Sequence, residues 1–187
     1  MIAVTKRSFF LSLVLVAGCA SGQKYKDKAM DFAAVKTVAV LPFQNLSRDN
    51  QAGERVRDVF SNALLATGGI YVLPQGEVTR GLQKAAVALP ATPTKEDVVN
   101  LGKGLGVEAV FTGTLKEYGE IRSGTASANA ISLSVEMIEV TTGKIVWSAT
   151  STRGGIGFWD RLFGGGGEPM NKVTEDAVND LIGKLFK

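Results

Sequence analysis

The chain has 187 residues, of which 45% are hydrophobic, 21% are charged and 7% are aromatic. This length suits one domain, and the hydrophobic fraction excludes a wholly disordered chain. The sequence has no His and a single Cys, which excludes a disulfide framework within the chain and a metal site built from nitrogen and sulfur ligands. A catalytic triad that needs an imidazole is excluded as well, and we expect no cofactor and no metal.

The first eighteen residues are typical of a secretory signal peptide. Lys6 and Arg7 precede the apolar run 9–17, which is too short to cross the ~30 Å hydrocarbon core of a bilayer. Small residues follow, up to Gly18 and Cys19. Removal of residues 1–18 takes away two basic side chains, so that 19 Lys and Arg remain against 18 Asp and Glu. The mature chain is nearly neutral, and we expect no nucleic-acid partner.

The sequence Val16-Ala17-Gly18-Cys19 resembles the lipobox of bacterial lipoproteins. The resemblance implies cleavage between Gly18 and Cys19, a diacylglycerol thioether on the Cys19 thiol, and acylation of the new amino group. A single acyl chain gives marginal binding to a membrane, whereas several give a stable anchor. Ala20 follows the cysteine in place of Asp, which implies sorting to the outer membrane, where we expect the protein to face the periplasm. A buried free thiol is the alternative for Cys19.

The segment after the cysteine is small and polar and predicts a flexible tether over residues 19–30. About nine extended residues reach no more than ~30 Å, so the folded domain, residues 31–187, is expected to stay near its membrane. Asp31 is predicted to cap a single helical turn at the start of this domain.

The rest of the chain predicts an α/β domain with a mixed sheet. The apolar run Thr37–Leu41 is typical of a central strand that is buried on both faces, and a short strand follows at 70–73. Three consecutive strands at 107–118, 128–140 and 145–150 predict an antiparallel meander, whose apolar face must be covered by helices. Apolar residues at helical spacing predict four helices, which contain residues 56–64, 77–88, 94–105 and 170–185.

No segment predicts a catalytic residue. The glycines from Gly102 to Gly106 are spaced somewhat as in a dinucleotide-binding loop, but they follow a helix and precede a strand, so they predict a helix C-terminus. Neither a pair of carboxylates nor a serine with a neighbouring base is visible. We therefore expect a protein that is not an enzyme.

One aromatic segment lies between two glycine clusters and away from the predicted helices and strands. It contains Phe158, Trp159, Arg161, Leu162 and Phe163. Exposed aromatic and Arg side chains provide a large contact area and lose little conformational entropy on binding. We therefore hypothesise that this loop contacts a partner or a membrane surface. The alternative is a loop that folds back and buries its aromatic rings in the core.

Three segments carry a resemblance to a known group of proteins. They are 37–45 (TVAVLPFQN), 106–114 (GVEAVFTGT) and 140–148 (VTTGKIVWS), in this order. Their succession resembles that of the CsgG-like and LpoB-like envelope lipoproteins. The resemblance implies an anticodon-binding-like α/β domain that acts through protein contacts.

On this basis we expect an outer-membrane lipoprotein that serves as a non-enzymatic accessory or scaffold in envelope assembly or secretion. Its partners would be the membrane, through the lipid anchor, and an envelope protein that the sequence does not name; a homo-oligomer is compatible with the sequence. An activator-type regulator of a peptidoglycan synthase and a subunit of a curli-type secretion channel are the alternatives. A binding module for a small envelope ligand ranks behind them.

Overall fold

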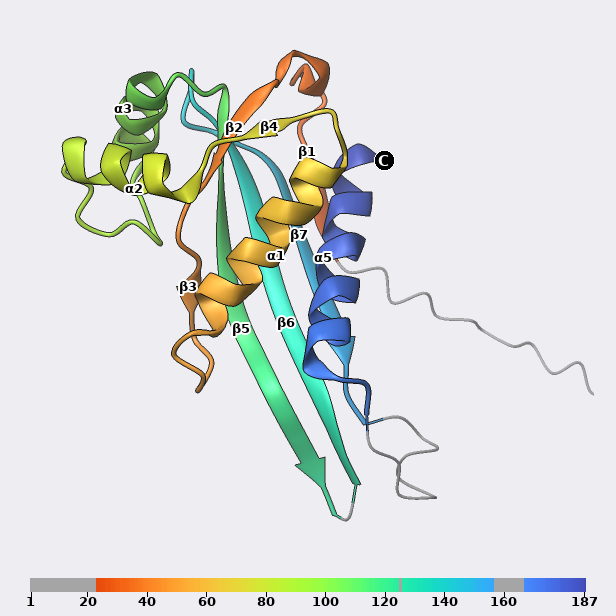
Figure 1. Cartoon of the computed structure of the whole chain (residues 1–187). Helices are drawn as coiled ribbons and strands as arrows, with labels where there is room; N and C mark the ends of the chain where they lie inside the picture. Colours follow the sequence, from red (N-terminus) through yellow and green to blue (C-terminus); the bar gives the residue numbers. More distant parts are fainter. Residues whose placement is uncertain (1–22, 125, 157–166) are drawn as a thin grey trace, which may run out of the picture.

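A computed structural model describes residues 23–124, 126–156 and 167–187 (Figure 1). These residues form a seven-stranded mixed sheet with the order β1-β7-β6-β5-β2-β4, and β3 pairs with β5 beside this path. Helices pack against the sheet, so the expected α/β class with a mixed sheet is confirmed.

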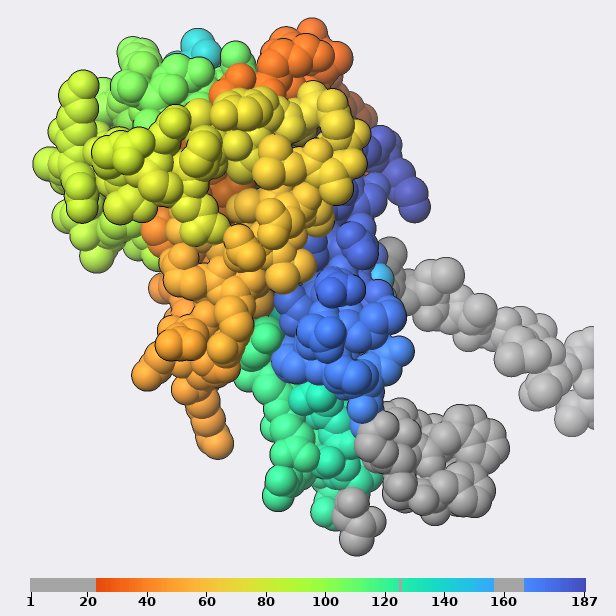
Figure 2. Space-filling view, viewed as in Figure 1, coloured from red at the N-terminus to blue at the C-terminus, as the bar shows by residue number. Residues whose placement is uncertain are grey.

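The predicted meander forms the centre of the sheet. It consists of β5 (Ala109–Ser123), β6 (Ala126–Glu139) and β7 (Ile145–Gly154), which pair antiparallel. Both β5 and β7 run farther than the sequence predicts. As a result, the β5–β6 hairpin projects beyond the helices at the lower end of the view (Figures 1 and 2).

The parallel part of the sheet contains the predicted central strand. β2 (Thr37–Val40) lies between β5 and the two-residue strand β4 (Tyr71–Val72) and pairs parallel with both. Its residues alternate between two hydrophobic clusters, because Val38 and Val40 face one side of the sheet and Ala39 faces the other. β3 (Gln44–Asn45), which the sequence does not predict as a strand, extends the parallel pairing along β5.

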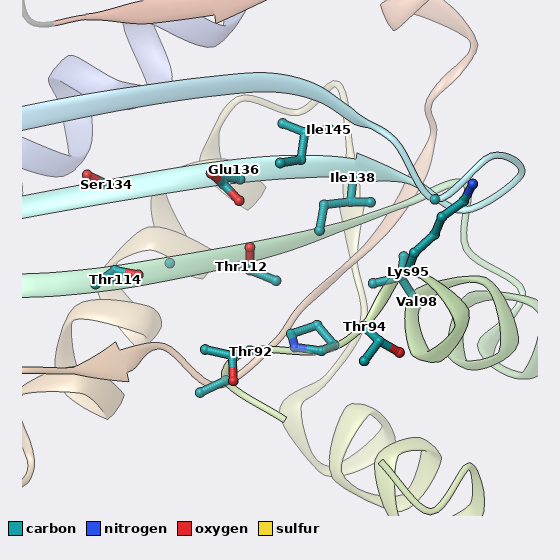
Figure 3. Close-up of a pocket in the computed structure, with 14 residues that line it drawn as sticks. Thr92, Thr94, Lys95, Val98, Thr112, Thr114, Ser134, Glu136, Ile138 and Ile145 are labelled. Atoms are coloured by element: carbon teal, nitrogen blue, oxygen red, sulfur yellow. The ribbon is translucent and has the colours of Figure 1, made fainter. Parts of the chain in front are cut away.

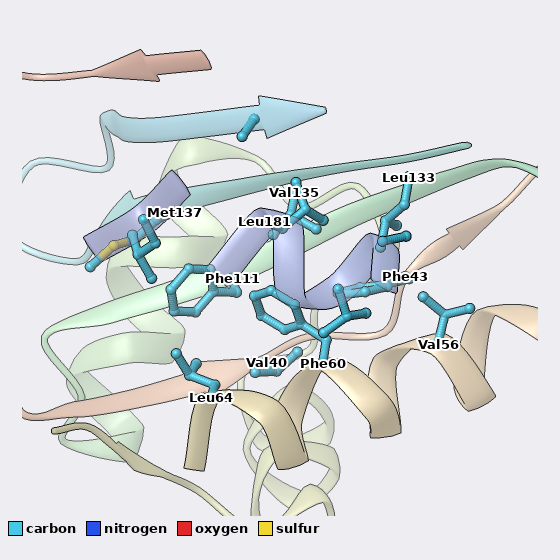
Figure 4. Close-up of a cluster of buried hydrophobic side chains, with 14 of the residues drawn as sticks. Val40, Phe43, Val56, Phe60, Leu64, Phe111, Leu133, Val135, Met137 and Leu181 are labelled. Carbon is cyan, nitrogen blue, oxygen red and sulfur yellow. The ribbon is translucent and has the colours of Figure 1, made fainter. Parts of the chain in front are cut away.

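Two helices cover the apolar face of the meander, as predicted. They are α1 (Ala52–Ala66) and α5 (Met170–Phe186). Between them and the sheet, Phe60 packs against Phe43 and Phe111, with ring centroids 5.9 and 5.4 Å apart (Figure 4). Phe111 packs in turn against Trp147, with ring centroids 6.4 Å apart. These rings make the larger of two cores, because one face of the sheet and both helices contribute to it.

The other two predicted helices pack on the opposite face of the sheet. α2 (Gln75–Lys84) and α3 (Lys95–Leu105) form the smaller core with residues of β2, β5 and β6. Gly106 takes φ 70° at the end of α3, which confirms that this glycine-rich segment ends a helix. A side chain at Gly102 would overlap Val140, so the glycine allows α3 to lie directly on the end of β6.

The tether region is partly ordered. β1 (Lys24–Lys26) pairs antiparallel with β7 at the edge of the sheet, and Asp31 caps the predicted turn as a 3-10 helix (η1, Phe32–Ala34). Part of the predicted tether thus pairs with the sheet, and only a few residues separate Cys19 from β1. Cys19 itself, Gly18 and the aromatic loop 158–163 lie outside the described residues. In the part that is described, no helix has the length and apolar character needed to cross a membrane.

Candidate functional site

The polar face of the meander is the most distinctive surface of the described chain. Because side chains alternate along a strand, the residues opposite the larger core form rows across β5, β6 and β7. One row is Thr112–Glu136–Ser148 and the next is Thr114–Ser134–Thr150. In the second row the hydroxyls of Ser134 and Thr150 share a hydrogen bond of 2.8 Å.

A hollow of about 370 Å³ opens over these rows. The segment 91–95, which leads into α3, forms its opposite wall, and Figure 3 shows Thr112, Thr114 and Glu136 on the strands with Thr92 and Thr94 across from them. Ile138 and Ile145 line its apolar end. The hollow is thus a cleft between a sheet face and a loop, with hydroxyls on both walls.

The loop wall is held by the start of α3. Thr94 and Asp97 form a capping box, in which the Thr94 hydroxyl accepts from the Asp97 N–H and the Asp97 carboxylate accepts from the Thr94 N–H. The β6–β7 turn supports the same helix end. Gly143 takes φ 64° there, and a Cβ at this position would overlap the side chain of Lys95. The turn and the helix therefore fix the wall in place.

The lining of the hollow supplies mainly hydrogen-bonding groups. Its lining offers one carboxylate, Glu136, one ammonium, Lys95, and the hydroxyls of Thr and Ser residues. Such groups form hydrogen bonds with amides, hydroxyls or amines of a partner. A single carboxylate does not provide the pair that acid–base hydrolysis requires. Among the described residues, no three of the side chains Asp, Glu, His or Cys gather into a site that would hold a metal ion.

Of the residues predicted from sequence to act, none lies in the hollow. Cys19 precedes the first described residue, Gln23, by four positions. The aromatic loop lies outside the described residues, but both of its ends are fixed on β6: the Gly155 N–H donates to Asn129 and the Gly167 N–H donates to Ser127. The sequence analysis missed the hollow. Its polar strand face was visible as the alternation at Ser132, Ser134 and Glu136, whereas the position of segment 91–95 was not.

The described residues define the class of α/β domains with a mixed sheet and helices on both of its faces, here with a hydroxyl-lined hollow on one face. The chain is a member of a lipoprotein family: residues 25–155 match the family described as "Putative lipoprotein GNA1162-like". A comparison with curated proteins gives no match.

Several solved structures share the fold. The PelC dodecamer from Paraburkholderia phytofirmans is 18% identical with a TM-score of 0.56, over 87% of this chain and 96% of that chain. Lipoprotein GNA1162 from Neisseria meningitidis is 18% identical with a TM-score of 0.56, over 81% and 98%. The LpoB C-terminal domain from Salmonella enterica is 16% identical with a TM-score of 0.51, over 67% and 86%. At these identities the likeness is one of fold alone: it agrees with the fold that the LpoB-like part of the resemblance implies, and the CsgG-like part stays a prediction.

Proposed function

We propose that the chain is an outer-membrane lipoprotein, anchored through acylated Cys19 and facing the periplasm, that acts as a non-enzymatic accessory or scaffold in envelope assembly or secretion. The main support for this proposal is the position of the lipobox cysteine, Cys19, four residues before Gln23, the first described residue. The family that the chain matches is one of lipoproteins. The hollow supports the second half of the proposal, because its hydroxyls, lone carboxylate and lone ammonium suit binding better than catalysis.

The anchor is tested on the protein purified from membranes. Intact-mass measurement should give a chain that begins at Cys19 and carries three acyl chains, and density-gradient fractionation should place it with outer membranes. The Cys19→Ser variant should leave the membrane fraction. An unmodified Cys19 in the wild-type protein, or retention of residues 1–18, would refute the anchor.

The scaffold role is tested at the open sheet face. Crosslinking in intact cells followed by purification should recover an envelope protein or further copies of this chain, and the dodecamer of the PelC neighbour supports self-assembly as one form of the scaffold. Ser134→Arg places a long charged side chain in the hollow and should abolish the crosslinks. Asn100→Arg adds the same charge on the exposed side of α3 and is the matched control. Equal crosslinking of both variants would contradict a role for this face.

The aromatic loop is a second contact in this proposal. Replacing Trp159 and Phe163 with Ser should leave the unfolding temperature unchanged and reduce partner capture or membrane contact. A loss of folding would favour buried aromatic rings instead, and unchanged folding with unchanged capture and membrane contact would remove the loop from the proposal.

An activator-type regulator of a peptidoglycan synthase is the second candidate function. The fold shared with the LpoB C-terminal domain favours it, and a direct assay of synthase activity with and without the purified chain would test it. The curli-type channel subunit stays a prediction of the sequence resemblance, to be tested by conductance across a planar bilayer.

A further inference from the structure

A basic groove of about 770 Å³ runs along the edge of β7, next to the point where the chain enters the sheet. Its lining combines Gln23, just before β1, with residues of β5, β7 and α5. The charged residues that line it are Lys116, Arg153, Lys184 and Lys187 against one carboxylate, Asp180. The mature chain as a whole is nearly neutral, with 19 basic and 18 acidic residues, so this surface concentrates positive charge that the composition does not reveal.

The groove is structurally fixed along one side. The Lys184 ammonium donates to the carbonyl of Thr150 at 2.8 Å and pairs with Asp180 at 2.6 Å, and Arg153 pairs with the other oxygen of Asp180 at 2.6 Å. Partial burial opposes ionisation of Asp180, but the hydrogen bond and charge of Lys184 and the charge of Arg153 outweigh it and lower the pKa of this carboxyl. One carboxylate therefore serves two cations, and the groove keeps a surplus of positive charge.

The remaining cations point to solvent. Lys116 and Lys187 are exposed and form no ion pair with a described residue, and Lys24 on β1 adds a further exposed ammonium close to Gln23. Two large rings flank the same edge. Tyr25 is 50% exposed on β1 and Phe186 is 54% exposed at the end of α5. Aromatic side chains beside basic ones are typical of surfaces that lie at the headgroup level of a bilayer.

The short chain between Cys19 and Gln23 keeps the β1–β7 edge close to the proposed lipid anchor. Cys19 and Gln23 are separated by four residue steps, which span at most ~14 Å when fully extended. An acylated Cys19 holds its own backbone at the membrane surface, so Gln23, one of the residues that line the groove, must lie within that distance of the headgroups. This step rests on the lipid anchor of the proposed function.

From this geometry we propose that the β1–β7 edge is the face on which the domain rests against the bilayer, with the phosphates of anionic lipids in the basic groove. The surface then positions the domain, whereas the acyl chains only retain it. Each Lys or Arg near an anionic surface contributes about fivefold in binding, equal to about 1 kcal/mol.

The test uses the mature chain with Cys19→Ser, which has no acyl chains, so that the folded domain alone determines binding. Vesicles of phosphatidylcholine with an equal part of phosphatidylglycerol should sediment this protein, and vesicles of phosphatidylcholine alone should not. Raising the salt from about 0.05 to about 0.5 M should release it, because exposed charges are screened over a shorter distance.

Two triple variants locate the binding. Lys24→Gln, Lys116→Gln and Lys187→Gln together should weaken vesicle binding on the order of 100-fold. A control triple removes three exposed charges from α2 and α3, whose shared core contains residues of β2, β5 and β6 and none of β1 or β7. The control changes are Arg80→Gln, Lys84→Gln and Lys103→Gln.

Three results would overturn the proposal that the groove binds anionic lipid. The first is equal binding to both vesicle types, and the second is an equal loss of binding in the two triple variants. The third is release from vesicles by a soluble polyanion while the triple variant at Lys24, Lys116 and Lys187 binds as wild type does. The salt dependence is measured on a protein with its groove intact, so binding that persists at about 0.5 M salt also overturns the proposal even if a triple variant fails to fold. Acylation of Cys19 is measured separately, from the intact mass of the wild-type chain. An acylated Cys19 without vesicle binding by the Cys19→Ser chain refutes the groove and leaves the proposed anchor standing.

Discussion

Replacing Gly113 with Ala should destabilise the domain by overpacking the larger core. Gly113 lies on β5 between Thr112 and Thr114, which point into the hollow. A side chain at Gly113 would point to the opposite side of the sheet, toward Phe43. A Cβ at this position would sit 2.7–2.8 Å from three atoms of the Phe43 ring. That ring is 5% exposed and packs on Phe60 at 5.9 Å, so it has little room to retreat. Overpacking of this kind costs about 1–3 kcal/mol.

In a domain of this size, 1 kcal/mol corresponds to about 2–4 °C in the unfolding temperature. We therefore expect Gly113→Ala to lower Tm by about 2–12 °C, measured by circular dichroism on the mature chain, with urea unfolding as the second measurement. Phe43→Leu removes the ring, so the double variant should show a coupling of about 1 kcal/mol or more between the two sites.

Gly104→Ala is the control for this prediction. Gly104 lies on the exposed side of α3 with no atom within 4 Å of its would-be Cβ, so this change should leave stability unchanged or raise it by up to about 1 kcal/mol. The overpacking argument is refuted if Gly113→Ala unfolds at the wild-type temperature. It is refuted equally if the change costs the same with and without the Phe43 ring.

The remaining predictions concern the wall of the hollow and the edge of the groove. Thr94→Ala removes the helix cap of α3 and should cost about 1 kcal/mol in the free energy of unfolding, whereas Thr94→Ser should retain most of it. Asp180→Asn leaves Arg153 and Lys184 without their carboxylate and should cost about 1 kcal/mol at neutral pH. Because folding lowers the pKa of Asp180, its stabilisation is complete above the ordinary Asp value of about 4 and is lost as the pH falls through the lower folded value. Urea unfolding of wild type and Asp180→Asn should therefore differ at pH 7, and the difference should shrink as the pH falls below about 4; a constant difference would contradict the assigned ion pairs.

The elements that the sequence predicts well are those whose pattern is set by burial. The apolar run at Thr37–Leu41 is continuous because both faces of β2 are covered. The apolar residues Leu133, Val135 and Met137 alternate with polar ones in β6 because only one face of that strand packs on the larger core. Gly106 and Gly143 mark a helix end and a turn because both need positive φ. In each case the local sequence and the tertiary environment impose the same constraint.

The elements that the sequence misses are those defined by a distant partner. Lys24–Lys26 carries no apolar pattern, and it forms β1 because β7 leaves its edge open for pairing. Gln44 and Asn45 become β3 because β5 extends past β2. The hollow depends in the same way on segment 91–95 crossing over β5, which a pattern within either segment does not encode. The position of the hollow is therefore determined more by contacts between distant segments than by local secondary-structure propensity.

The hollow and the groove share one row of side chains across the sheet, and this adjacency limits how a partner can approach. The row Thr114–Ser134–Thr150 begins in the hollow on β5 and ends in the groove on β7. Adjacent strands are about 4.8 Å apart, so the row spans about 10 Å. If the groove rests on headgroups, a partner in the hollow must also lie close to the membrane surface. With Cys19 acylated as proposed, the short link from Cys19 to Gln23 would also keep the domain near the membrane surface. Such an arrangement would favour a partner that is itself held at the same membrane, including a second copy of this chain.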